Sequence, residues 1–246
     1  MNNKNVQYLA IGLTLILIAG IIWFSKPKVN PEEVVINTET DTNPGIQLCF
    51  AKFGKVNERG FYDKHTLKML LKGENVTGEL KFLPAEKDSK LGKFEGTVSA
   101  VDKIAMARTV NAIWPTFSEG VFNKEELSIM FGEGTARVGF GEMVARADGV
   151  YGYKDPANIA YSLELNDVAC GDIDERELVE NHLRTNITTL SPVKATMGGT
   201  WQVFSAYVDM SKNEGKVVYE DGHMQEKRTF TYTTNEKSEV VTMTIK

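Results

Sequence analysis

The sequence predicts a mostly β protein with an N-terminal transmembrane helix, followed by an antiparallel barrel-like or sandwich domain that contains one late α-helix. Three observations predict this class. Residues 8–24 contain no charged residue. From residue 46 onward, short apolar or alternating runs are separated by Gly, Asn and Asp, a pattern typical of strands joined by tight turns. After the segment 8–24, only residues 174–190 place apolar side chains at helical spacing.

The apolar segment 8–24 has the properties of a membrane anchor. As an α-helix it would span roughly 25 Å, the lower end of what a bilayer core requires. Tyr8 and Trp23 lie near its two ends, where aromatic rings favour the membrane interface. A cleaved signal peptide is the alternative, but residues 21–24 (IIWF) offer no small-x-small cleavage site. We therefore predict an uncleaved signal anchor over residues 1–25, with the lipid bilayer as the partner of residues 8–24.

The orientation of the anchor does not follow from its flanking charges. Lys4 and the amino terminus balance Lys26 and Lys28. The anchor resembles a secretory signal, and this predicts a single-pass protein of the cell membrane with its globular domain outside the cytoplasm, in the cell envelope. A cytoplasmic domain is the alternative.

The remainder divides into a stalk and a folded region. Residues 26–45 are rich in Pro, Asn, Thr and acids, a composition that predicts a flexible stalk. Residues 46–246 are predicted to be the β-rich extracytoplasmic domain. They form either one domain or two subdomains, 46–171 and 193–246, joined by the helix at 174–190.

The strands are predicted from apolar runs and the turns between them. Gly132-Glu133-Gly134 is the strongest hairpin signal, because two strand-like runs flank it directly. The expected strands are Thr66–Leu71, Val76–Leu83, Lys93–Val101, Ile104–Ala112, Leu127–Phe131, Thr135–Phe140, Ile159–Leu165, Thr200–Val208, Lys216–Tyr219, Arg228–Thr233 and Val240–Ile245.

The predicted helix has recognisable ends. Asp174 is expected to cap its first turn, with Glu177 at the capping-box position. Pro192 marks its end.

Charge excludes one large class of partners. The chain has 28 basic and 33 acidic residues, and its first 30 residues contain three lysines and no acid. The rest therefore has 25 basic residues against 33 acidic ones, a net charge of −8. Nucleic-acid binding depends on basic patches, so no nucleic-acid partner is predicted.

The two cysteines, Cys49 and Cys170, are a candidate disulfide. In an oxidising compartment a bridge between them would close a long loop and stabilise the fold. The alternative is two buried free thiols, because sequence alone does not establish the geometry of a bridge.

Metal and cofactor sites are not predicted. The three histidines, His65, His182 and His223, have no His or Cys neighbour at ligand spacing. His223 is a candidate site residue for proton transfer, because Glu220 and Asp221 precede it closely. The alternative is a polar hairpin turn.

Acidic and aromatic residues supply the remaining candidate ligand-binding positions. Glu119 and Glu142 each lie beside a glycine near strand sequence, where a carboxylate can face a cavity. Solvent-facing carboxylates are the alternative. Trp114 and Trp201 are expected in the core, or else at the mouth of a barrel that takes an apolar or sugar ligand.

Six short segments form a recognisable pattern: VTGE at 76–79, LPAEKD at 83–88, GKFEGT at 92–97, SEG at 118–120, GGTW at 198–201 and VYEDGH at 218–223. This pattern resembles uncharacterised membrane-anchored envelope proteins of bacteria, and the region it samples is most of residues 46–246. The resemblance implies a bacterial envelope location. It implies no catalytic residue.

The predicted function is a membrane-tethered extracytoplasmic domain that binds an unknown envelope ligand or protein. We favour binding over catalysis because no catalytic or cofactor signature is present in the sequence. One alternative is a carboxylate-dependent hydrolase that acts on cell-wall glycans through acids such as Glu119 and Glu142. Another is a purely structural envelope component.

Overall fold

The computed structural model describes residues 44–118, 120–237 and 239–246. The predicted anchor and almost all of the predicted stalk lie outside these residues. Among the residues that the structure describes, no helix combines the length and the apolar character needed to cross a membrane.

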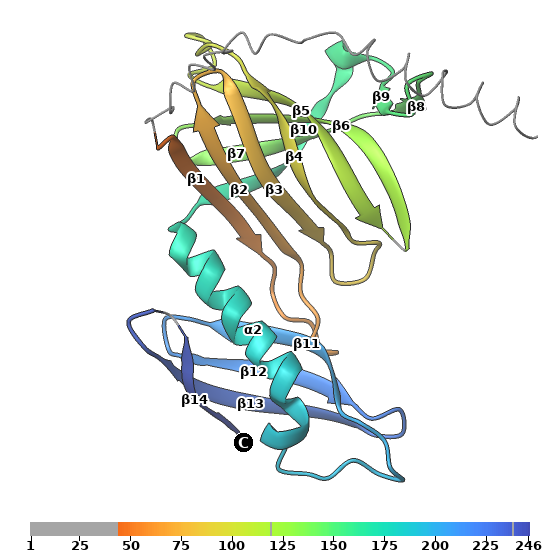
Figure 1. Ribbon diagram of the computed structural model, residues 1–246, viewed down its shortest axis with the longest axis vertical. Coiled ribbons are helices and arrows are strands. Elements are labelled where there is room, and N and C mark those ends of the chain that lie inside the picture. The colour runs from red at the N-terminus through yellow and green to blue at the C-terminus, as the bar shows by residue number, and fades with distance from the viewer. Residues whose placement is uncertain (1–43, 119, 238) are drawn as a thin grey trace, which may run out of the picture. The chain divides into compact units, whose positions relative to one another are not determined.

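Eight antiparallel strands close into a barrel (Figure 1). Around the barrel the order is β1, β2, β3, β4, β5, β6, β7 and β10, and β10 pairs with β1 to complete the circle. A mostly β fold is thus confirmed, in its barrel-like form. The barrel strands are β1 (Ile46–Phe53), β2 (Lys64–Lys72), β3 (Asn75–Leu83), β4 (Lys90–Val98), β5 (Arg108–Ser118), β6 (Val121–Gly132), β7 (Thr135–Phe140) and β10 (Ala160–Asp167).

The barrel interior is filled by every second side chain of its strands. In β2, Leu67, Met69 and Leu71 are buried in the barrel core, whereas Lys68 and Leu70 between them are only partly buried on the outside. This alternation follows from the two-residue period of a strand. An eight-stranded barrel is just wide enough to be filled by side chains or to hold one small ligand.

The hairpin predicted at Gly132-Glu133-Gly134 is confirmed. β6 and β7 pair up to Gly132 and Thr135, and the two turn residues Glu133 and Gly134 have φ values of 49° and 76°. Positive φ at both turn residues is the geometry whose twist matches two antiparallel strands.

In the N-terminal half, the sequence prediction missed one strand and placed the start of another wrongly. No strand was predicted over β1, which pairs along its whole length with β2. The strand expected at Ile104–Ala112 begins only at Arg108, because residues 99–107 form a loop. Asp102 causes the difference, since its carboxylate accepts the backbone N–H groups of Ile104 and Ala105 and turns the chain there.

The barrel wall is incomplete between β6 and β7. β6 pairs with β5 over its full length, but it pairs with β7 only from Ile129 opposite Val138 to the turn. Beyond that point a short hairpin of β8 (Met143–Ala145) and β9 (Tyr151–Tyr153) lies beside β6, with Tyr151 opposite Glu125. A single 3-10 turn at Pro156–Asn158 leads back to β10.

The helix α2 (Cys170–Leu190) begins four residues before the predicted start. Its N-cap is Ala169, so the prediction that Asp174 caps the helix was wrong. Asp174 instead lies within the helix and forms an ion pair of 2.5 Å with Lys68 of β2. At its first residue the helix is joined to the barrel, because Cys170 forms a disulfide with Cys49 of β1.

After α2 the chain forms a second antiparallel sheet with its own core. Its strands follow one another in sequence order, and the helix covers one face of the sheet through Val179, Leu183 and Ile187 (Figure 1). Trp201, Tyr219 and other side chains of the sheet complete this core. The strands are β11 (Gln202–Asp209), β12 (Glu214–Glu220), β13 (Gln225–Thr234) and β14 (Val240–Ile245).

The loop between β1 and β2, residues 54–63, connects the barrel with this second sheet. Ser205 of β11 donates its hydroxyl to the carbonyl of Gly60 at 2.8 Å. The rings of Phe61 and Tyr62 meet Phe204 and Tyr207 edge to face at centroid distances of 5.4 and 5.2 Å. Backbone and aromatic contacts together therefore hold the loop on the sheet.

Candidate functional site

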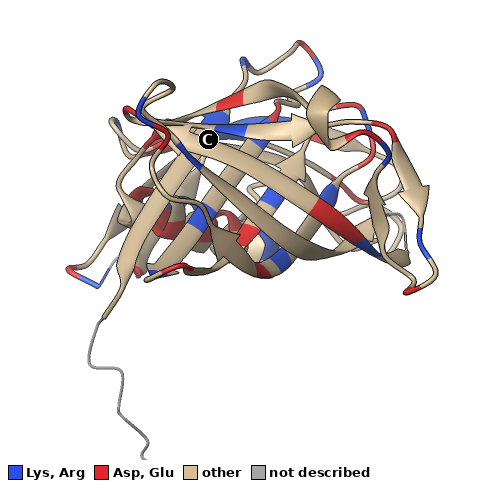
Figure 2. Cartoon of the chain, turned by 90° about the horizontal axis from the view of Figure 1, so that it is seen from above, with Lys and Arg blue, Asp and Glu red and all other residues tan. Residues whose placement is uncertain are grey.

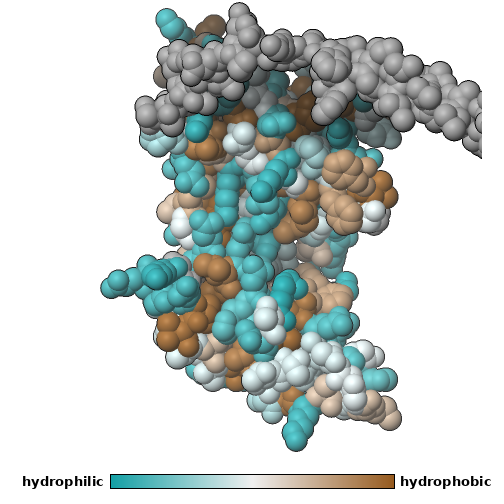
Figure 3. Space-filling view, viewed as in Figure 1, coloured by the Kyte–Doolittle hydropathy of each residue, from teal (hydrophilic) through white to brown (hydrophobic). Residues whose placement is uncertain are grey.

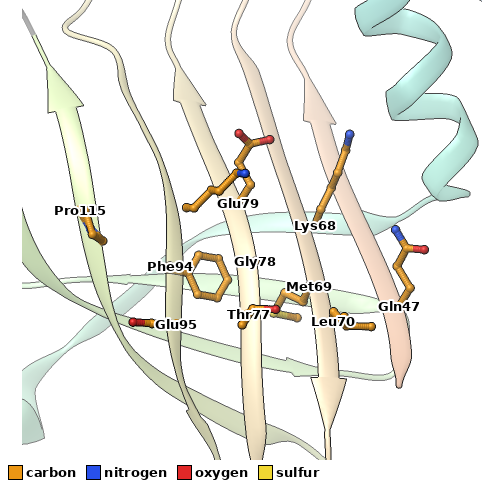
Figure 4. A pocket seen from close by; sticks show the side chains of 11 residues that line it. Gln47, Lys68, Met69, Leu70, Thr77, Gly78, Glu79, Phe94, Glu95 and Pro115 are labelled. Atoms are coloured by element: carbon orange, nitrogen blue, oxygen red, sulfur yellow. The ribbon is translucent and has the colours of Figure 1, made fainter. Parts of the chain in front are cut away.

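Several hollows open on the described surface, including one of about 410 Å³ beside Glu95 and Arg146, and two others combine apolar with charged lining residues. The larger, about 540 Å³, lies on the outward face of β1 to β5 (Figure 4). Its rim has side chains of mixed charge, including Lys68, Glu79 and Glu95. Lys68 is already paired with Asp174 on α2, and Figure 3 shows that the surface over these strands is largely hydrophilic. Two charged side chains of this hollow are therefore already in ion pairs, Lys68 with Asp174 and Glu79 with Lys81.

The second hollow, which we name the barrel pocket, has a volume of about 300 Å³ and lies where β6 and β7 separate. Small-molecule sites in proteins begin at about this size and are mostly apolar, with a few polar groups. The apolar wall comes from inward positions of four barrel strands: Leu80, Phe82, Trp114, Leu127, Val138 and Phe140.

One ion pair lies within this apolar wall. Glu125 shares its strand face with Leu127, and Lys90 shares its face with Phe94, so both side chains point inward. The Nζ of Lys90 lies 2.8 Å from each carboxylate oxygen of Glu125. The pair consists of two charged groups with a net charge of zero, and it lies at the edge of the apolar space. Lys90 can donate hydrogen bonds there and Glu125 can accept them.

Trp114 is held in a fixed orientation at the back of the pocket. Its indole Nε1 donates to the carbonyl of Gly92 at 3.0 Å. Gly92 has no side chain, and an added Cβ would lie only 2.0 Å from the carbonyl oxygen of Pro115. A glycine at this position is therefore required for the close approach of β4 and β5 that positions the ring.

Tyr153 closes the outer side of the opening. Its hydroxyl donates to the carbonyl of Gly139 at 3.0 Å and accepts the N–H of Ser128 at 3.4 Å. Burial raises the pKa of this hydroxyl, so it stays protonated and keeps its donor. Glu126 fixes the same hairpin by accepting the backbone N–H of Tyr153 at 2.9 Å and by pairing with Arg146.

Two buried polar atoms lie at inward positions at the same end of the barrel. The ring of His65 stacks on Phe82, a wall residue, with centroids 4.6 Å apart. Its Nδ1 and the hydroxyl of Thr116 have no hydrogen-bond partner among the described residues. Buried polar groups in proteins are almost always paired, so both atoms require a partner from water or a ligand.

His65 is expected to give the protein a pH-dependent stability. Burial lowers the pKa of its imidazole below the ordinary value of 6.5. The unfolded chain therefore binds this proton more readily than the folded one, so stability is complete above pH 6.5 and decreases as the pH falls below it. The variant His65→Gln should show a smaller decrease in melting temperature between about pH 7 and pH 5. Equal pH profiles for the two proteins would contradict this expectation.

The candidate residues from the sequence occupy different places. Trp114 lines the barrel pocket, whereas Trp201 is buried in the second sheet and donates its indole N–H to the carbonyl of Val193. Glu142 is exposed and forms an ion pair of 2.8 Å with Lys154. Glu119 lies outside the described residues.

His223 is exposed, on the turn between β12 and β13. The nearby carboxylate of Asp221 is fully used by the turn, because it accepts N–H groups from Thr196, His223 and Met224. These hydrogen bonds, that of Thr196 first, hold the pKa of Asp221 well below its ordinary value. The arrangement is that of a turn-stabilising aspartate, as in the polar-turn alternative.

Charged residues are dispersed over the molecule. Figure 2 shows positions of Lys and Arg interspersed with those of Asp and Glu. Among the described residues, no group of three or more His, Cys, Asp or Glu side chains is arranged to bind a metal ion.

Fold and site together define an antiparallel β-barrel with a side pocket, braced by a helix and a second sheet. Comparison of the chain with protein-family models, with curated proteins and with solved structures finds no match in any of the three.

Proposed function

We propose that this protein is a membrane-tethered, extracytoplasmic binding domain that holds a small amphipathic molecule in the barrel pocket. The barrel pocket is the observation that carries the proposal: an apolar wall from four strands that surrounds one inward ion pair. The tether is supported by the uncharged segment 8–24 and its aromatic ends.

The pocket favours a particular chemistry of ligand. Trp114 and Phe140 offer aromatic surface to an apolar body, while Lys90 and Glu125 offer a donor and an acceptor to a polar end. The two charges neutralise one another, so a ligand with net charge would have to break the pair. A neutral or zwitterionic molecule with an apolar ring or short chain fits without that cost.

Hydrolysis of glycans gains less support. The side chain of Glu142 faces solvent in its ion pair with Lys154, so it offers no carboxylate to a cleft. In the pocket, the carboxylates of Glu125 and Glu126 are each held by a basic side chain. The participation of Glu119 stays a prediction, because this residue lies outside the described residues.

Saturable binding of 1-naphthylamine, a small neutral aromatic amine, is the expected result for the full chain in lipid nanodiscs. Its emission shifts to shorter wavelength in an apolar site, and empty nanodiscs supply the background. Phe140 is 42% exposed, so Phe140→Ser should leave the fold intact. The loss of one aromatic wall residue should weaken binding about tenfold, which corresponds to about 1.4 kcal/mol.

Phe122→Ser is the matched control. Phe122 is also an exposed phenylalanine of the barrel, at 62%, but it lies on the outside near the tip of the β5–β6 hairpin and does not line the pocket. Its variant should bind the amine as the wild type does. Equal weakening by both substitutions, or no binding above empty nanodiscs, would refute the pocket as the binding site.

A further inference from the structure

The loop between β4 and β5 presents a group of apolar side chains to solvent. Ile104 is 97% exposed, and Val101 and Met106 are each 56% exposed. Single exposed apolar residues are ordinary on protein surfaces, but a gathered group indicates a contact surface. Lys103 lies between them in the sequence.

The loop is held in this shape by hydrogen bonds of its own. Asp102 accepts the N–H groups of Ile104 and Ala105, and its backbone exchanges hydrogen bonds with Ala107. Met106 has a φ of 48°, an uncommon value for a residue other than glycine. The apolar tip is therefore preformed, and a partner would need to order little of it on contact.

Strand direction places this loop at the end of the barrel where the chain enters. Neighbouring strands from β1 to β5 are all antiparallel, so β1 begins at the end where β4 finishes and β5 starts. Ile46, the first residue of β1, is itself 64% exposed. Residues 25–45 separate this end from the uncharged segment 8–24. A flexible linker of that length would have a typical end-to-end distance of about 25 Å, which would keep this end of the barrel near the bilayer.

We propose that this loop, with Ile104 at its tip, inserts into the surface of the bilayer that residues 8–24 span. The inference rests on the membrane tether of the proposed function and adds a second membrane contact to it. Neighbouring turns at the same end contain Glu74 and Glu133. The negative charges of these two residues would oppose electrostatic attraction of this end to anionic lipid. Burial of the apolar tip is therefore the driving force, and Lys103 can lie at the headgroup level.

This docking gives the barrel pocket a defined direction. The wall residue Phe82 lies near the end of β3, and Lys90 is the first residue of β4, so the pocket is at the opposite end from the inserted loop. The pocket would then lie on the part of the barrel that is farther from the bilayer, accessible to molecules in the surrounding aqueous space.

Depth-dependent fluorescence quenching tests the docking. The variants Ile104→Trp and Val101→Trp each place a reporter on the loop, and Phe122→Trp places one at the opposite end of the barrel. Full chains are compared in phosphatidylcholine nanodiscs with and without bromine on the acyl chains, and the wild-type signal is subtracted. Insertion to the boundary of the acyl chains should remove about half of the fluorescence added at residue 104 or 101. The fluorescence added at residue 122 should not change.

The outcomes separate the two proposals. One outcome is that brominated lipid quenches Trp23 of the wild type, while the two loop reporters are quenched no more than the reporter in Phe122→Trp. In that case the docking is wrong and the tether stands. If the wild-type chain does not remain with the nanodiscs and Trp23 is not quenched, the tether fails and the docking fails with it. Quenching of both loop reporters with an unchanged signal at residue 122 supports the docking.

Discussion

Replacing Glu180 by alanine is expected to lower the free energy of unfolding by about 3 to 5 kcal/mol, because it leaves a buried basic partner uncompensated. The Glu180 side chain is only 7% exposed and forms an ion pair with Lys64, which is itself largely buried. The hydroxyl of Tyr62 lies 3.1 Å from the same carboxylate and 2.9 Å from the carbonyl of Ala206. Burial, and then the charge of Glu180, raise the pKa of Tyr62.

Glu180 matters because this group of residues joins α2, which carries Glu180, to three other parts of the fold. Lys64 begins β2, Tyr62 belongs to the loop before it, and Ala206 lies on β11. Loss of the carboxylate should therefore weaken the contact of the barrel with α2 and the second sheet together. Chemical denaturation of the full chain, followed by circular dichroism, measures the effect.

Glu164→Ala is the control for this prediction. Glu164 forms an ion pair of 2.7 Å with Arg137, but both side chains are about half exposed. Exposed pairs contribute at most about 1 kcal/mol, so this variant should unfold nearly as the wild type does. A loss for Glu180→Ala no larger than that for Glu164→Ala would contradict the structural role assigned to the buried pair.

Removal of the disulfide is expected to have an effect of similar size. The bond joins Cys49 to Cys170 across 121 residues of sequence. Closure of a loop of this length restricts the unfolded chain and stabilises the fold by about 4 to 5 kcal/mol on the chain-entropy model. Cys49 is also buried beside Ala51 and Ile173, so its replacement by alanine opens little space.

Two perturbations should give the same loss of stability. These are reduction of the wild type with dithiothreitol and the double substitution Cys49→Ala, Cys170→Ala. Dithiothreitol should have no further effect on the double variant, because these are the only two cysteines of the chain. A wild type that is demonstrably reduced yet melts at an unchanged temperature would show that the bridge adds no stability.

Local signals in the sequence predicted the local structure well. The turn at Gly132-Glu133-Gly134 was predictable because a glycine flanked by strand-like runs permits the positive φ that a tight hairpin needs. The start of β5 was not predictable in this way, because a single side chain, Asp102, turns the backbone where the apolar pattern suggests a strand. Closure of the barrel by β1 and β10 depends on pairing between residues more than 100 positions apart, which no local pattern contains.

The candidate site was predictable only in part. Trp114 could be placed because an aromatic residue in a strand of a barrel faces either the core or its opening. Lys90 and Glu125 were missed, although Glu125 alternates in phase with Leu127 and Ile129 and therefore had to face inward. Their pairing depends on register across β4, β5 and β6, and register is set by turns and closure rather than by composition.

The most direct test of the account uses the three tryptophans of the chain, which lie in three different parts of it. Trp23 belongs to the predicted anchor, Trp114 lines the barrel pocket and Trp201 is buried in the second sheet. The measurement is the nuclear magnetic resonance spectrum of the ¹⁵N-labelled indole groups of the full chain in nanodiscs, during titration with 1-naphthylamine. The account predicts that the signal of Trp114 moves and saturates while that of Trp201 stays in place. A titration in which Trp114 does not move, or in which Trp201 moves as far, would contradict it.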